Sequence, residues 1–133
     1  MLRPSHVPRS LSPPLPWHPA SNTSASLYAI WGTDANNLYA VGDNGTIINW
    51  NGSSWSTMSS GTDYRLEAIW GWNTSNIYAG GVEGTVLYFD GSSWEPIMGV
   101  SRYADVVDIL GFSATDVRFA TRQPFSAIYR LIP

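Results

Sequence analysis

The chain has 133 residues, no cysteine and no lysine, and its 7 arginines and 10 acidic residues give a formal net charge of −3. This length allows one domain, and the absence of cysteine excludes a disulfide framework. A net negative surface without lysine is a poor match for phosphate groups, so we expect neither nucleic acid nor an anionic membrane as the partner.

Residues 1–14 are expected to form a proline-rich lead-in. Six of the nine prolines lie before residue 20, and proline at this density favours an extended, polyproline-like conformation. The start of the chain lacks the apolar segment of a signal peptide, and no run is long and apolar enough to span a membrane. The sequence therefore leaves the cellular compartment open.

Residues 15–20 form a short segment that we interpret as a spare outer strand. The interval along the chain from Trp17 to Leu27 is almost the same as that from Trp55 to Leu66 in the repeat described next. This similar spacing predicts that Trp17 occupies the position of Trp55, in a sheet whose other strands come from elsewhere in the chain or from another copy.

Residues 27–55 and 66–94 repeat one another without a gap, so every position of the first stretch has a counterpart in the second. A period of about 40 residues indicates a repeat architecture. The residues that recur include Ile30 and Ile69, Trp31 and Trp70, Gly32 and Gly71, Tyr39 and Tyr78, Gly45 and Gly84, Gly52 and Gly91, and Trp55 and Trp94.

Each repeat contains four short apolar runs that are separated by clusters of glycine, asparagine, aspartate and serine. The runs are rich in β-branched and aromatic residues and do not keep helical spacing, so we expect four antiparallel strands and no helix. A four-stranded unit of this length is typical of a propeller blade. We therefore assign blade 1 to residues 27–58 and blade 2 to residues 66–98.

The repeats carry a motif that resembles a known group of proteins. G-T-[IV]-x-x-[WF]-[ND]-G-S-S-W is followed, after a loop, by L-x-A-I-W-G and then by N-[LI]-Y-A-[VG]-G. In this motif residues 27–98 resemble the tandem repeats of bacterial β-propellers related to Asp-box and photosystem-assembly-factor propellers. The resemblance implies that the corners at 51–55 and 90–94 are folding features and that the chain is a binding or assembly scaffold. It does not imply sialidase activity.

Residues 104–131 continue the repeat at nearly the same period and predict a degenerate blade 3, with Leu110 at the position of Trp70. This blade lacks an outer strand, which the segment 15–20 is able to supply in cis or in trans. Because closed propellers have roughly four to eight blades, three blades make only part of a ring. We expect a homodimer that forms a six-bladed ring. The alternative is a piece of a larger propeller protein.

Catalytic and metal chemistry have little support in the sequence. The only histidines are His6 and His18, and without cysteine or paired histidines we expect no nucleophilic triad, metal site or cofactor. Asp43 and Glu83 occupy adjacent positions in the same turn of successive repeats, which would bring two carboxylates to one face, as glycoside hydrolysis requires. The alternative is that both are polar turn residues, and a hydrolase remnant is the least favoured function.

Trp72 stands where blade 1 has Thr33, so the repeat itself does not require this ring. With Asn73 beside it, the indole offers a flat apolar face next to hydrogen-bonding groups, which is typical of a sugar platform. Local packing is the alternative.

The loops between blades carry a second group of candidate binding residues. Tyr64 and Arg65 lie between blades 1 and 2, and Arg102 and Tyr103 lie between blades 2 and 3. Tyrosine and arginine are enriched at binding hot spots, and loops on a rigid scaffold are common places for function. The alternatives are a subunit contact and a solvated loop.

These features predict an all-β β-propeller built of four-stranded antiparallel blades, about three per chain. The expected function is a non-catalytic binding module, with carbohydrate as the favoured ligand because weak, repeated, aromatic-rich sites add by multivalency. A protein-interaction or assembly scaffold is the second hypothesis.

Overall fold

The computed structural model describes residues 21–97, 100–122, 124 and 126–131. The lead-in (1–14) and the expected outer strand (15–20) lie outside the described residues. The first two sheets contain β1 (Leu27–Asp34), β2 (Asn37–Gly42), β3 (Ile47–Trp50), β4 (Trp55–Met58), β5 (Leu66–Asn73), β6 (Asn76–Gly81), β7 (Val86–Phe89) and β8 (Trp94–Pro96). The third contains β9 (Val106–Ser113), β10 (Asp116–Thr121) and β11 (Ile128–Arg130).

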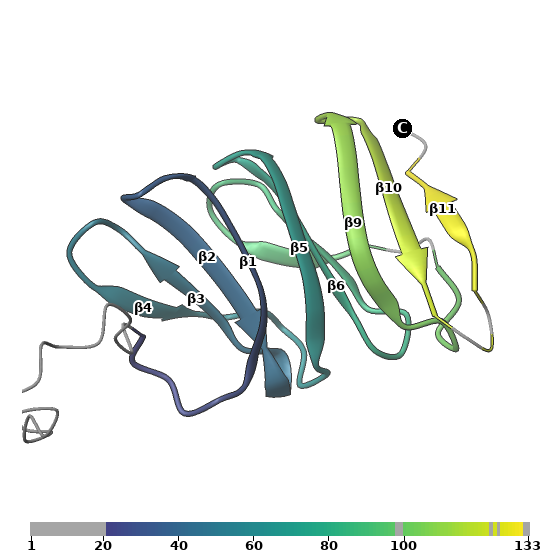
Figure 1. The fold of residues 1–133 in the computed structure, drawn as a ribbon, viewed down its shortest axis with the longest axis horizontal. Coiled ribbons are helices and arrows are strands. Elements are labelled where there is room, and N and C mark those ends of the chain that lie inside the picture. Colours follow the sequence, from purple (N-terminus) through teal and green to yellow (C-terminus); the bar gives the residue numbers. More distant parts are fainter. Residues whose placement is uncertain (1–20, 98–99, 123, 125, 132–133) are drawn as a thin grey trace, which may run out of the picture.

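The strands form three antiparallel sheets that follow one another along the chain. The first two have four strands in sequence order, and the third has three strands within the described residues, in the order β11-β10-β9. Figure 1 shows the sheets side by side, and β5 contacts both β1 and β9. The predicted all-β fold with four-stranded blades and about three blades per chain is confirmed.

Within the described residues, one short element departs from the expectation of no helix. This 3₁₀ turn, η2 (Asp43–Gly45), connects β2 to β3. Its cause is local: Asn44 and Gly45 both have positive φ, at 58° and 68°, and Glu83 and Gly84 repeat this conformation at 60° and 67° in the second sheet. Two successive residues with positive φ are typical of a tight hairpin turn, because their twist matches that of the strands.

Each sheet has two different faces, which we name after one residue pair. The Trp face carries Trp31 in the first sheet, Trp70 in the second and Leu110 in the third, and the Gly face carries Gly32, Gly71 and Gly111. A Cβ added at Gly71 would lie 2.5 Å from Trp31 Cζ2, and one added at Gly111 would lie 2.1 Å from Trp70 Cη2. The Trp face of each sheet therefore packs on the Gly face of the next, and only glycine permits the approach.

Further aromatic and aliphatic contacts complete these two joints. Tyr39 lies 6.1 Å from Phe89 between the first and second sheets, and Tyr78 lies 6.0 Å from Phe119 between the second and third, measured between ring centroids. The fully buried side chains belong mostly to the same joints and include Val41, Ile47, Leu66, Ile77, Leu87, Val106 and Val117. The hydrophobic core is therefore divided between the joints.

We predict that replacing Trp70 destabilises the protein far more than replacing Trp72, which lies further along the same strand. Trp70→Ala leaves a cavity over Gly111 and should lower the free energy of unfolding by about 2–4 kcal/mol. Trp72, whose ring is 52% exposed, should cost no more than about 0.5 kcal/mol when replaced by alanine. Urea unfolding of the two variants measures the difference, and equal losses would contradict the joint described above.

Candidate functional site

The turns and loops gather at two opposite ends of the sheets. At the linker end, the β2–β3 and β6–β7 turns lie against the linkers that join one sheet to the next, since a Cβ at Gly45 would meet the Thr62 carbonyl and Gly84 N donates to the Ala104 carbonyl. At the hairpin end, the corners at Gly52 and Gly91 lie against the β1–β2 and β5–β6 turns, near Asn36 and Ser75 respectively. The structure therefore divides the eight predicted site residues between two surfaces.

The linker end holds the tyrosines and arginines of the linkers. Tyr64 is 52% exposed and Tyr103 is 60% exposed. The Arg102 guanidinium lies 4.9 Å from the centroid of the Tyr103 ring, and its Nη2 donates to the Tyr103 hydroxyl at 2.9 Å. This cation–π contact restrains two long side chains, so they present a partly ordered surface before any partner binds.

Arg65 belongs to an ion-pair network that the sequence did not reveal. Its guanidinium lies 5.5 Å from the centroid of the Tyr28 ring on β1 and 3.4 Å from Glu67 Oε2 on β5. The nearby Glu67 carboxylate raises the pKa of Arg65. Glu67 also accepts from Arg122, which follows β10 and pairs with Asp105 at 3.7 Å. These contacts connect the three sheets near the linker end.

Asp43 and Glu83 lie in successive turns at the linker end, as expected from the repeat. Their roles in the fold differ. Asp43 N donates to the Ser26 carbonyl, and Glu83 N donates to Asp105 Oδ1 at 3.2 Å. Neither carboxylate lines the depressions described below. Among the described residues, no group of three His, Cys, Asp or Glu side chains is placed to hold a metal ion.

The hairpin end holds Trp72 and Asn73, at the end of β5. The Trp72 ring is exposed, but the Asn73 side chain is engaged by its own turn. Asn73 Oδ1 accepts from Ser75 N and from Asn76 Nδ2, both at 2.9 Å. The amide oxygen that would contact a sugar beside Trp72 therefore already has two local donors.

The corners at the hairpin end are stabilised by one side chain each. Asp90 Oδ1 accepts from Ser92 N at 2.8 Å and from Ser93 N at 3.0 Å, and Asn51 makes the same two bonds in the first sheet. The Ser93 amide first, and then the Ser92 amide, holds the pKa of Asp90 below its ordinary value. The carboxylate thus has a structural role at this corner.

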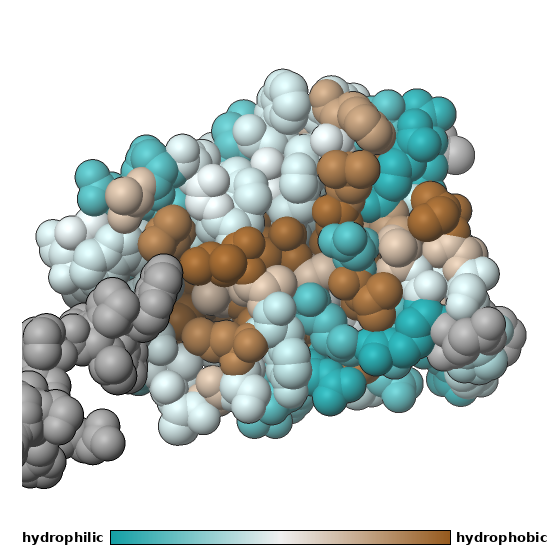
Figure 2. Space-filling view, viewed as in Figure 1, coloured by the Kyte–Doolittle hydropathy of each residue, from teal (hydrophilic) through white to brown (hydrophobic). Residues whose placement is uncertain are grey.

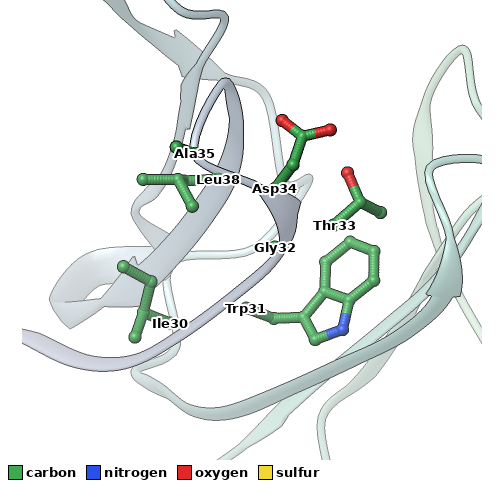
Figure 3. Close-up of a pocket in the computed structure, with 7 residues that line it drawn as sticks. All are labelled: Ile30, Trp31, Gly32, Thr33, Asp34, Ala35 and Leu38. Carbon is green, nitrogen blue, oxygen red and sulfur yellow. The ribbon is translucent and has the colours of Figure 1, made fainter.

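Two further surfaces carry no predicted site residue. A shallow depression of about 350 Å³ surrounds Gly32, and Figure 3 shows Ile30, Ala35 and Leu38 on one side of β1 and the Trp31 ring on the other. A second depression, of about 310 Å³, lies on the third sheet beside Leu110. The repeat pattern points to both surfaces, because within the described residues the outer faces of the first and third sheets have no neighbouring sheet.

Comparisons with known proteins find a similarity to solved structures. No family model matches the chain, and no curated protein matches it. A solved structure described as "YCF48 bound to D1 peptide" is similar, with a TM-score of 0.69 and 22% sequence identity over 89% of this chain. The chain spans 41% of that chain's length. The likeness shows the fold: the chain is built as a β-propeller. Within the described residues no helix is long and apolar enough to cross a membrane.

We predict that Asp90→Asn keeps the corner but removes a pH-dependent part of the stability. Because the pKa of Asp90 is lowered in the folded state, its carboxylate stabilises the fold above about pH 4, and this contribution is lost as the pH falls through the folded pKa. The stability advantage of the wild type over Asp90→Asn should therefore shrink between pH 5 and about pH 2. Thermal unfolding across this range measures it.

The sister corner provides a matched control. Asn51→Asp should gain the same pH-dependent stability that Asp90→Asn loses, because both side chains accept the same two backbone bonds. A stability difference that does not change with pH in either variant would contradict this account of the corners.

Proposed function

We propose that the chain is a non-catalytic β-propeller scaffold that binds an extended protein segment at the linker end. The observation that carries the proposal is a group of four linker residues, Tyr64, Arg65, Arg102 and Tyr103, in which both tyrosines are exposed. The Arg102 guanidinium stacks on Tyr103, whereas the half-buried Arg65 stacks on Tyr28 and pairs with Glu67. Tyrosine and arginine dominate binding hot spots because they combine a large contact area with directed hydrogen bonds. Restraining them beforehand lowers the entropy lost on binding.

The chemistry of the cluster favours a segment that carries a carboxylate. Within the described residues, Arg102 forms no ion pair, and its Tyr103 contact uses only one of the five N–H donors of a guanidinium. A carboxylate of the partner would form a charge-assisted pair with the remaining donors. Tyr103 and Tyr64 would then contact the apolar parts of the same segment.

The comparison supports a protein segment as the ligand class. The similar propeller in the solved structure is described with a bound peptide, and propellers place such ligands on the loops at one end of the ring. This similarity does not assign a particular peptide to the present chain, so the partner is defined here by the chemistry of the linker end alone.

Carbohydrate binding at Trp72 and Asn73 is the second candidate. The exposed Trp72 ring, at a position where the first repeat has threonine, favours it. It is weaker than the linker-end proposal because the Asn73 amide is engaged by its own turn. A hydrolase remnant based on Asp43 and Glu83 has the least support, since neither residue lines a depression described above.

We also propose that the three sheets form part of a closed ring. Closed propellers contain roughly four to eight blades, so further blades must come from a second copy or from a longer protein. A second copy would give a homodimeric, six-bladed ring with two linker-end sites, which would increase the apparent affinity for repeated segments. In the same ring, the corners at Asn51 and Asp90 would act as Asp-box-type folding features.

The test uses an array of short peptides that vary in acidic and aromatic content, with a glycan array in parallel. We expect binding to acidic, aromatic peptides, and Arg102→Ala and Tyr103→Ala should each weaken it about tenfold, as expected for hot-spot residues. Trp72→Ala, at the opposite end, is the matched control and should leave peptide binding unchanged. Glycan binding that is lost in Trp72→Ala, with no peptide binding, would overturn the proposal in favour of a lectin.

A further inference from the structure

The two joints inside the chain are built by the same rule, which leaves one half of a joint at each end of the array. Trp31 covers Gly71 and Trp70 covers Gly111. Among the described residues, no sheet covers the Gly face of the first sheet or the Trp face of the third. Apolar side chains line both open faces, and on the side shown in Figure 2 a band of apolar residues, in brown, runs from the first sheet to the third.

The apolar residues of the open Gly face match those of its buried counterpart in the second sheet, but within the described part of the chain they have no partner sheet. Ile30 is 63% exposed, whereas Ile69 at the same position of the second sheet packs against the core. Leu27 is likewise exposed, whereas Leu66 is fully buried. The depression around Gly32 lies on this face. It occupies the position at which, in the second sheet, the Trp31 ring packs over Gly71.

The open Trp face carries the matching projection. Leu110 stands at the position of Trp31 and Trp70 and is 56% exposed, beside exposed Phe112 and Ile128. A leucine at this position supplies an apolar side chain over the facing glycine, as the tryptophans do in the internal joints. Three exposed apolar side chains on one sheet face mark an interaction surface.

Charge distinguishes these open faces from the internal joints. In the second sheet Tyr78 donates its hydroxyl to the Ala114 carbonyl in the β9–β10 turn. Arg118 replaces this tyrosine in the third sheet, where it lines the open Trp face. The residue equivalent to Ala114 in the first sheet is Ala35, which follows Asp34 in the depression on the open Gly face.

Asp34 and Arg118 therefore differ from the residues at the equivalent positions of the internal joints, and each lies on an open face. The turn position of Asp34 is occupied by Asn73 and Ser113 in the other sheets, and the position of Arg118 is occupied by tyrosine. Arg118 already pairs with Asp116 at 3.1 Å and lies over the Phe112 ring. Asp108 also lines this face, and its Oδ1 accepts a hydrogen bond from Ile109 N. These contacts hold the Arg118 guanidinium on the open surface, where it can reach an acidic partner.

We infer that the Trp face of the third sheet docks on the Gly face of the first sheet of a second copy, with Leu110 over Gly32 and Arg118 beside Asp34 and the Ala35 carbonyl. This inference rests on the proposed ring and specifies how it closes. The contact is head-to-tail, so each copy offers one face of each kind. Three sheets per chain make two copies the number that reaches a closed ring of roughly four to eight blades.

The first experiment measures molar mass by light scattering coupled to size-exclusion chromatography. We expect the wild type to elute as a dimer of the 14.6 kDa chain, and Leu110→Glu and Ile30→Glu each to elute as a monomer. Both side chains are more than half exposed within one copy, so circular dichroism should show that each variant stays folded. A monomeric wild type, or dimers in both variants, would overturn the inference.

Mixing the two variants distinguishes this joint from other dimers. Leu110→Glu retains an intact Gly face and Ile30→Glu retains an intact Trp face, so an equimolar mixture should regain dimers through one undamaged joint. A symmetric contact between like faces would not be restored in this way. When circular dichroism shows both variants folded, failure of the mixture to associate overturns the head-to-tail joint.

The charge pair is tested by removing one charge at a time. Asp34→Asn keeps the turn, because Asn73 makes the same local bonds, and Arg118→Gln removes the guanidinium charge. Each should weaken the dimer about tenfold, since the ring contains the pair twice, and the double variant should lose little more than either single one. Losses of dimer affinity that simply add in the double variant would show that Arg118 and Asp34 do not pair in the joint.

Tyr103→Ala is the control that separates the two proposals. It should leave the dimer intact while weakening peptide binding, because Tyr103 lies at the linker end and not on either open face. A dimer that fails to bind peptides would refute the proposed ligand without affecting the joint.

Discussion

The contact between an indole ring and the glycine of the following sheet is the constraint on which the rest of the structure depends. It occurs twice, at Trp31 on Gly71 and at Trp70 on Gly111. The close approach sets the spacing between sheets, and the buried aliphatic side chains fill the remaining space. Because most of the core lies between sheets, the stability of each sheet depends on its neighbours, as in other repeat proteins.

The fold could be predicted from the sequence because its local and global signals agree. The gapless repeat indicated the number of strands per sheet, and the glycine- and asparagine-rich clusters marked the turns, two of which have positive φ at Asn44–Gly45 and Glu83–Gly84. The 3₁₀ turn at Asp43–Gly45 was not predicted, since so short an element carries no helical periodicity. Agreement between turn chemistry, strand pattern and packing is what allows a short repeat to specify one structure.

The candidate sites were only partly accessible from the sequence. Residue type and loop position identified Tyr64, Arg65, Arg102 and Tyr103, but the Glu67–Arg122 pair joins residues 55 positions apart and depends on how the second and third sheets meet. The importance of Arg118 emerges only when it is seen on the face where Tyr78 makes its contact in the preceding sheet. Contacts between sheets require their relative placement, which periodicity within one sheet does not provide.

The likeness of the two internal joints also affects how such a chain could gain or lose repeats. Since both joints are centred on the same contact, a large apolar side chain over a glycine, duplicating or deleting one whole repeat unit would leave the central contact of each remaining joint unchanged. No single repeat would determine the number of blades in the proposed ring. Ring size would instead follow from the wedge angle between neighbouring sheets, so small changes in the side chain over the glycine offer a route from one blade number to another.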